Sequence, residues 1–173
     1  SNPETQDKIG RMAGSLLPKV SFLNPVLTYT VSRYQTACGS ADIFNHIMEV
    51  YFNLNQDLYL LDSCMEAMMR TVIKYAPIAL RQPDDYEARA NLMWTSSWAI
   101  NGFADGGKRQ AWSCHPIEHE LSAVYDITHG HGRITGVEKY KCIPILGQFG
   151  LVGRIDPGSC GVNTETGQVS NSV

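Results

Sequence analysis

The chain has 173 residues and carries 14 Lys and Arg against 17 Asp and Glu, which gives a formal net charge of −3. The length suffices for one domain with a hydrophobic core. The basic residues are scattered and form no stripe, which argues against nucleic acid as a partner, and no apolar run reaches the roughly 20 residues of a membrane-spanning helix. Cysteines are odd in number, widely spread and without a CxxC pair, which predicts reduced thiols and a cytoplasmic protein; they are Cys38, Cys64, Cys114, Cys142 and Cys160.

The first part of the chain predicts no helix. Residues 1–14 are polar and are expected to be solvated, with no signal peptide. Residues 19–31 are rich in β-branched and aromatic side chains and are interrupted by Asn24-Pro25. This pattern predicts one or two short extended segments around a turn.

Helical periodicity begins near Gln35 and continues for about a hundred residues. Apolar side chains recur at helical spacing in residues 41–53 and 58–75, and residues 84–103 form a third helix with Asp84 or Asp85 as the N-cap. A fourth helix begins near His115, since Pro116 suits its first turn, and residues 126–132 are expected to form a turn. The Met and aromatic side chains of these helices are expected to fill a helical core.

The pattern changes at residue 133, after which the chain is apolar or polar without helical periodicity. The sequence therefore predicts a mainly α protein in three parts. Residues 1–34 form a polar start and an extended connecting segment, residues 35–132 a helical domain, and residues 133–173 an atypical end with short strands or irregular chain.

Five histidines and one aspartate suggest a metal site. Asp42 and His46 lie four residues apart, on one face of a predicted helix. The other four histidines gather in residues 115–131, and His115 and His119 repeat the four-residue spacing. Either group alone is more typical of a surface hydrogen bond or a core histidine. Together they offer a carboxylate and several imidazoles, which suit Fe(II) or Zn(II), and a buried carboxylate needs such a partner. Cys114, beside His115, is an alternative thiolate ligand.

Residues 19–132 resemble the iron-containing (group III) alcohol dehydrogenases, in particular their NADP-dependent butanol-dehydrogenase branch. The resemblance rests on the paired signatures AD-x-x-x-H and H-x-x-x-H-x(9)-H and on the stretches around them. These stretches are NPVLTYT, QTACGSADIFNHIMEVYFN, residues 69–80, PDDYEARANLMWTSSWAINGF and AWSCHPIEHELSAVYDITHGHG.

The resemblance implies a role for each of these residues. One divalent ion, Fe2+ or Zn2+, would be bound by Asp42 and His46 and by two histidines fourteen residues apart, which map to His115 and His129. His119 would be a catalytic residue that relays a proton, and His131 a neighbouring polar residue. By a weaker correspondence, Leu27 and Thr28 would touch the cofactor, NADP(H).

The family also has an N-terminal dinucleotide-binding α/β domain with a GGGS turn, and the sequence contains neither GGGS nor GxGxxG. The chain is therefore expected to be the C-terminal-type helical part of an NADP-dependent alcohol dehydrogenase or aldehyde reductase that acts on short primary alcohols such as butanol. The chain by itself is expected to be inactive, and the complete enzyme is expected to be a homodimer. Two alternatives remain. One is a non-catalytic metal-binding fragment, and the other is a metal-dependent hydrolase, which would need a second metal or a further buried carboxylate, with Glu118 and Glu120 as candidates.

Overall fold

The computed structural model describes residues 4–5, 16, 18–52, 58–108 and 114–131. All of these belong to the first of two units into which the chain divides, Ser1–Lys139, whereas the second unit, Tyr140–Val173, lies outside the described residues. The strands or irregular chain expected beyond residue 132 therefore also lie outside them.

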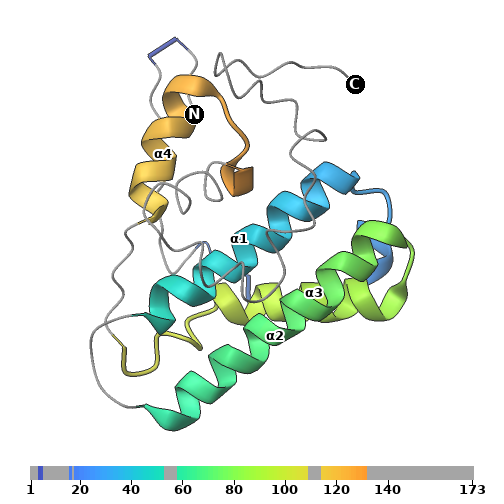
Figure 1. Cartoon of the computed structure of the whole chain (residues 1–173), viewed down its shortest axis with the longest axis vertical. Helices are drawn as coiled ribbons and strands as arrows, with labels where there is room; N and C mark the ends of the chain where they lie inside the picture. The colour runs from blue at the N-terminus through green and yellow to red at the C-terminus, as the bar shows by residue number, and fades with distance from the viewer. Residues whose placement is uncertain (1–3, 6–15, 17, 53–57, 109–113, 132–173) are drawn as a thin grey trace. The chain divides into compact units, whose positions relative to one another are not determined.

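The elements described over their full length are four α-helices and one 3₁₀ turn, residues 129–131 are also helical, and no described residue lies in a strand, which confirms the mainly α prediction. In chain order the elements are η2 (Pro25–Thr28), α1 (Arg33–Tyr51), α2 (Tyr59–Arg81), α3 (Tyr86–Ile100) and α4 (Cys114–Tyr125) (Figure 1). Of these helices, none combines the length and apolar character that crossing a bilayer requires.

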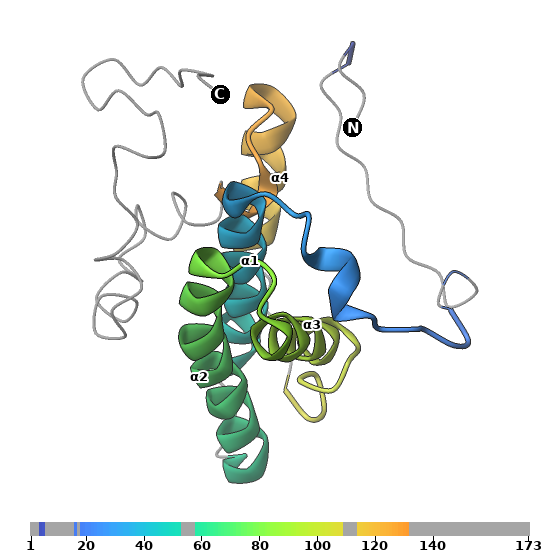
Figure 2. The same cartoon turned by 90° about the vertical axis from the view of Figure 1, so that its right-hand side faces the viewer.

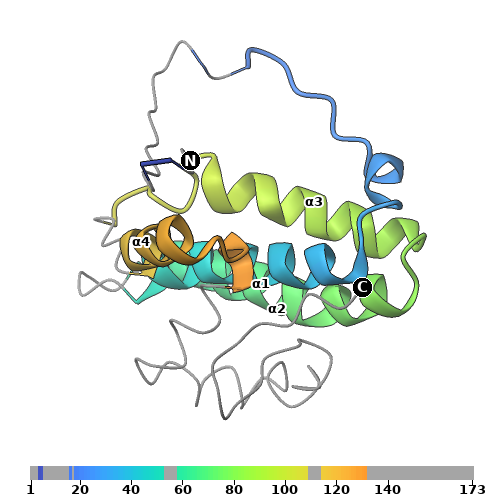
Figure 3. The same ribbon diagram turned by 90° about the horizontal axis from the view of Figure 1, so that it is seen from above.

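Helices α1, α2 and α3 pack against one another and enclose the core. Figure 2 shows α1 and α2 side by side, with α3 next to them and seen nearly end-on, and Figure 3 shows α4 in front of part of α1. Because neighbours flank α1 on several sides, it is the most buried helix. Its core side chains are Cys38, Phe44, Ile47, Met48 and Val50.

Helix α2 is longer than the sequence predicted, since it continues beyond Tyr75 and through Pro77 to Arg81. A proline inside a helix removes one backbone hydrogen bond and favours a stop. Here the buried Ala76 and Ala79, which flank Pro77, keep the last turns packed on the core. The expected core of Met and aromatic side chains is confirmed for Met65 and Met69, which are buried on the same helix, but it is wrong for Tyr59, Tyr86 and Trp94, which are exposed.

Helix α3 starts where the sequence predicted. Asp85 is its N-cap, and its side chain accepts a hydrogen bond from the Ala88 amide at 2.8 Å. Arg89 is buried in the first turns and donates from Nε to the Pro83 carbonyl and from Nη1 to Thr36 Oγ1 of α1, at 2.8 and 3.0 Å. Burial lowers the pKa of this guanidinium from its usual value. The two hydrogen bonds connect α3 to the start of α1.

The connecting segment differs from the expected extended chain. Asn24 has extended backbone angles, but the next four residues, Pro25–Thr28, form a 3₁₀ turn. The cause is local, because the Asn24 side chain accepts a hydrogen bond from the Val26 amide at 3.1 Å and Pro25 fits the first helical position. Apolar side chains remain uncovered around this turn, notably Phe22 at 92% and Leu27 at 75% exposure.

Candidate metal centre

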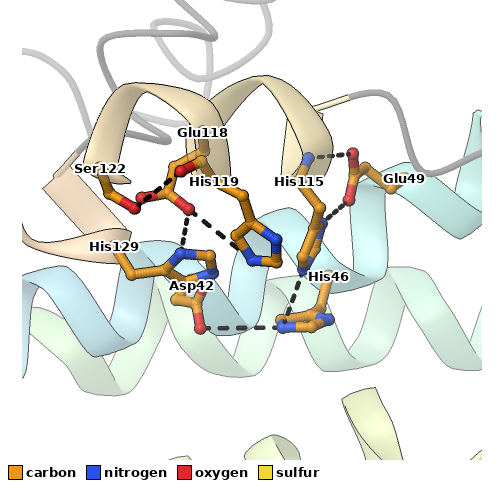
Figure 4. Close-up of polar contacts among 8 residues, drawn as sticks. All are labelled: Asp42, His46, Glu49, His115, Glu118, His119, Ser122 and His129. Atoms are coloured by element: carbon orange, nitrogen blue, oxygen red, sulfur yellow. Dashed lines mark hydrogen bonds and ion pairs between the residues drawn. The ribbon is translucent and has the colours of Figure 1, made fainter. Parts of the chain in front are cut away.

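Asp42 and His46 lie on the face of α1 that meets α4, as their four-residue spacing predicted (Figure 4). His46 Nε2 is 3.7 Å from Asp42 Oδ2. The side chains keep 13% and 28% of their exposure, so both are shielded from solvent without being sealed from it. An aspartate oxygen and an imidazole nitrogen on adjacent turns thus point into one space.

His115 is brought to this space by the first turn of α4. Its Nε2 lies 3.2 Å from His46 Nε2, and the two rings meet edge to face with centroids 4.3 Å apart. The two histidines are 69 positions apart in the sequence, and they face each other through their Nε2 atoms.

His129 reaches the site from residues 126–131, the return segment that follows α4. The chain leaves the helix through Asp126, whose φ of 50° is left-handed, and folds back so that His129 Nε2 lies 3.6 Å from Asp42 Oδ1. Gly130 makes this return possible, because a Cβ at that position would lie 2.1 Å from the Cys38 carbonyl oxygen of α1.

The spacing of these donors fits a divalent metal ion. Two ligand atoms about 2.0–2.2 Å from one tetrahedral ion lie roughly 3.3–3.6 Å apart. The three neighbouring pairs, His115 with His46, His46 with Asp42, and Asp42 with His129, are separated by 3.2, 3.7 and 3.6 Å. The rings at the two ends, those of His115 and His129, have centroids only 5.8 Å apart. Neighbouring donors therefore have the separation that a shared ion requires, whereas the group whose ligand atoms all lie within 4.8 Å of one another, among the described residues, is Glu118, His119 and His129.

A second group of donors adjoins the first and shares His129. Among the described residues, Glu118, His119 and His129 each place one possible ligand atom within 4.8 Å of the others. Glu118 is 1% exposed and contacts His129 Nδ1, while its Oε2 is 4.0 Å from His119 Nε2. His119, the predicted proton relay, keeps 44% of its side-chain exposure, and its ring centroid lies 5.1 Å from that of His129.

Sequence reasoning did not identify Glu49, which is also part of the site. This carboxylate is 4% exposed, accepts a hydrogen bond from the His115 amide at 3.3 Å and contacts His115 Nδ1. The available signal was its place on α1, three residues after His46 and seven after Asp42, which puts it on the same helix face.

The remaining predicted residues lie elsewhere. The ring of His131 is 6.2 Å from that of Tyr34, so its described ring contact is with α1 outside the donor group. Leu27 is exposed on η2, and Thr28 donates from Oγ1 to the Pro25 carbonyl at 2.7 Å, within its own turn. The side chain of Cys114, the alternative ligand, lies outside the described part of the structure.

Residues 36–135 match the C-terminal part of the Fe-containing alcohol dehydrogenase family. The chain belongs to this family. The match covers α1 to α4 and the return segment, so it includes all four residues that surround the candidate metal centre. The recognition made from the sequence motifs is confirmed.

Named relatives agree with this membership. Two proteins of Clostridium acetobutylicum, NADH-dependent butanol dehydrogenases A and B, are 55% and 56% identical over 132 residues, which are 76% of this chain and 34% of each relative. The NADPH-dependent aldehyde reductase YqhD of Escherichia coli is 36% identical over 129 residues, or 75% of this chain and 33% of the relative. The chain thus spans about a third of the length of these relatives.

Solved structures show the same helical arrangement. The crystal structure of NADH-dependent butanol dehydrogenase A from Thermotoga maritima superposes with a TM-score of 0.73 at 41% identity, over 77% of this chain and 33% of that one. E. coli YqhD gives a TM-score of 0.74 at 34% identity over 77% and 34%. The expected fold, the helical C-terminal part of this family, is therefore confirmed.

Proposed function

We propose that this chain is the metal-binding catalytic part of an NAD(P)-dependent alcohol dehydrogenase or aldehyde reductase that acts on short primary alcohols such as butanol. The observation that carries the proposal is the series of neighbouring donors from His115, His46, Asp42 and His129, which are 3.2 to 3.7 Å apart. In this proposal they bind a single Fe2+ or Zn2+. The names of the relatives support alcohol and aldehyde substrates, with either NADH or NADPH as the hydride donor.

Each donor has a distinct part in the proposed chemistry. A bound divalent ion supplies Lewis-acid polarisation of the alcohol or aldehyde oxygen. Asp42 would contribute the negative charge that selects a cation, and the three imidazoles would add neutral nitrogen ligands. His119 is placed to move a proton, because its half-exposed ring lies beside His129 and connects the site to solvent.

Hydride transfer also requires a dinucleotide held against the substrate. The sequence contains neither GGGS nor GxGxxG, and Leu27 and Thr28 are proposed to touch the cofactor from the side of η2. The exposure of Leu27 makes it available for such a contact.

One observation favours the hydrolase alternative, and it gives that alternative a clear test. A metal-dependent hydrolase would need a further buried carboxylate, and Glu118 is buried beside His129. A hydrolase of that type holds two metal ions about 3.5–4 Å apart, whereas the dehydrogenase proposal needs one. Metal stoichiometry therefore separates the two functions.

The proposal is tested by elemental analysis of the full 173-residue chain after loading with Zn2+ or Fe2+ and gel filtration. We expect one equivalent of metal in the wild type and strong loss in His46→Ala and in His129→Ala. His131→Ala is the matched control, because its ring lies outside the donor group, and it should keep its metal. Two equivalents would favour the hydrolase, and full metal retention in both histidine variants would refute the assignment.

A further inference from the structure

Two buried glutamates have the same relationship to two of the proposed metal ligands. Glu49 of α1 contacts Nδ1 of His115, and Glu118 of α4 contacts Nδ1 of His129. Both carboxylates are almost completely buried, with side-chain exposures of 4% and 1%. Burying a carboxylate is costly unless a proton donor or a cation compensates it, so each glutamate needs the ring nitrogen that it contacts.

The contacts determine which ring nitrogen is left for a metal. When Nδ1–H of a neutral imidazole donates to a carboxylate, the lone pair for a metal lies on Nε2. In both histidines Nε2 is the nitrogen that faces the site, 3.2 Å from His46 for His115 and 3.6 Å from Asp42 for His129. Figure 4 shows the His129 ring between Glu118 and Asp42, and the His115 ring between Glu49 and His46.

Glu49 has a second effect, on the helix that carries His115. Its Oε1 accepts the backbone amide of His115 at 3.3 Å, within the first turn of α4. Backbone amides in a first helical turn have no partner inside the helix, and a carboxylate there is favourable. A side chain of α1 therefore fixes both the start of α4 and the orientation of its first histidine.

We propose that Glu49 and Glu118 are paired positioning residues, which hold His115 and His129 in the Nδ1–H tautomer and so aim both Nε2 atoms at one metal ion. This inference rests on the metal-binding function proposed above and adds residues that the ligand motif does not include. It also assigns Glu118 to orientation, not coordination, since its Oε2 contacts Nδ1 of His129 while Asp42 lies near Nε2 of the same ring. Carboxylate partners of this kind raise the basicity of a ligand histidine and fix its ring.

The first test measures the tautomers directly in the metal-free wild-type chain. Long-range ¹H–¹⁵N NMR of histidine side chains, recorded well above the ordinary imidazole pKa of about 6.5, distinguishes Nδ1–H from Nε2–H. The resonances are assigned with the His115→Ala and His129→Ala variants. We expect Nδ1–H for both. Nε2–H at either histidine would overturn the inference for its glutamate, and this measurement does not depend on metal binding.

The second test measures Co2+ affinity and the visible spectrum of the bound Co2+ in Glu49→Gln, Glu118→Gln and Glu120→Gln. Glutamine keeps the shape of the side chain and removes its charge, and Glu120 is the matched control because it is exposed on α4. We expect affinity to fall by about 10–100-fold in the first two variants, with an unchanged band pattern, and to be unaltered in the third.

The outcomes separate the inference from the function on which it rests. A wild type that binds no Co2+ refutes the proposed function, while the tautomer measurement still decides the inference. A wild type that binds Co2+, with Glu49→Gln and Glu118→Gln equal to Glu120→Gln, overturns the inference alone. A new band pattern in Glu118→Gln would show that Glu118 coordinates the metal with His119 and His129, and would overturn its positioning role. Far-UV circular dichroism of each variant checks that the helices are retained.

Discussion

Gly130 lies against the backbone of Cys38, so closely that a Cβ on Gly130 would be 2.1 Å from the Cys38 carbonyl oxygen and 2.5 Å from its carbonyl carbon. Cys38 is one helical turn before Asp42 on α1, and Gly130 follows His129 directly. The absence of a side chain at Gly130 therefore sets the distance between the return segment and α1. The 3.6 Å separation of His129 and Asp42 depends on it.

Gly130→Ala should weaken metal binding. The methyl group would meet backbone atoms, which cannot rotate away, so the return segment must move and carry His129 from Asp42. We expect Zn2+ affinity to fall by about 10–100-fold, comparable to the loss of an outer partner of a ligand, and stability to fall by about 1–3 kcal/mol through overpacking. A competition titration with a chromogenic chelator measures the first effect and urea unfolding measures the second.

Gly39→Ala is the matched control on the opposing helix. Gly39 lies inside α1, and a Cβ there would meet nothing within 4 Å. Alanine in place of glycine in a helix interior is favourable by about 0.5–1 kcal/mol, so this variant should unfold at higher urea and bind Zn2+ as the wild type does. Unchanged metal affinity in Gly130→Ala would contradict the steric argument.

The sequence was informative where function depends on local spacing. Asp42 and His46 are four apart on one helix, so their convergence followed from helical geometry alone, and the cap of α3 was expected at Asp84 or Asp85. His115 and His129 were selected by family resemblance, because helical spacing alone allowed His119 equally well. Their assignment as ligands stays a prediction.

What the sequence did not indicate arises from packing between distant segments. Glu49 looks like an ordinary helix residue until α4 places His115 against it, 66 positions later in the chain. Glu118 was considered only as a possible second carboxylate for a hydrolase, and its contact with His129 depends on the left-handed Asp126 that turns the chain back. The 3₁₀ turn at Pro25–Thr28 was missed because the Asn24 cap outweighed the β-branched composition of the segment.

His119→Ala should keep most of its metal and lose reaction rate when it is introduced into an active enzyme that contains this domain. The ring is half exposed and lies beside the ring of His129, which suits a proton relay better than a shielded ligand. Elemental analysis should find most of the wild-type Zn2+ content, because the affinity for Zn2+ should fall by about tenfold at most. The rate of aldehyde reduction should fall clearly. Metal loss equal to that of His115→Ala would make His119 a ligand, as its closeness to Glu118 and His129 allows.

Arg89→Lys should destabilise the helical core without touching the metal centre. The guanidinium makes two hydrogen bonds from fixed positions, to the Pro83 carbonyl and to Thr36 Oγ1. A lysine ammonium lacks this planar fork, so at least one buried acceptor loses its partner. We expect a loss of about 1–3 kcal/mol in urea unfolding. The control is Arg70→Lys, because Arg70 is 63% exposed in a pair with Glu66 on α2, and its effect should stay below about 0.5 kcal/mol.

The last prediction is that the 173-residue chain by itself neither binds NADPH tightly nor remains a clean monomer. Near-attack positioning of reactants supplies roughly 7–11 kcal/mol of a barrier, and this sequence contains neither of the dinucleotide-binding patterns GGGS and GxGxxG. Apolar side chains around η2, with Phe22 and Leu27 at 92% and 75% exposure, favour self-association. NADPH titration by fluorescence should therefore show no saturable site, and light scattering on the same sample should show a mass above that of the monomer.

Phe22→Ser with Leu27→Ser should lower that mass, while Tyr59→Ser, exposed at the start of α2, serves as the control. Stoichiometric NADPH binding by a monomer would contradict both parts and would require a cofactor site outside the Gly-rich pattern.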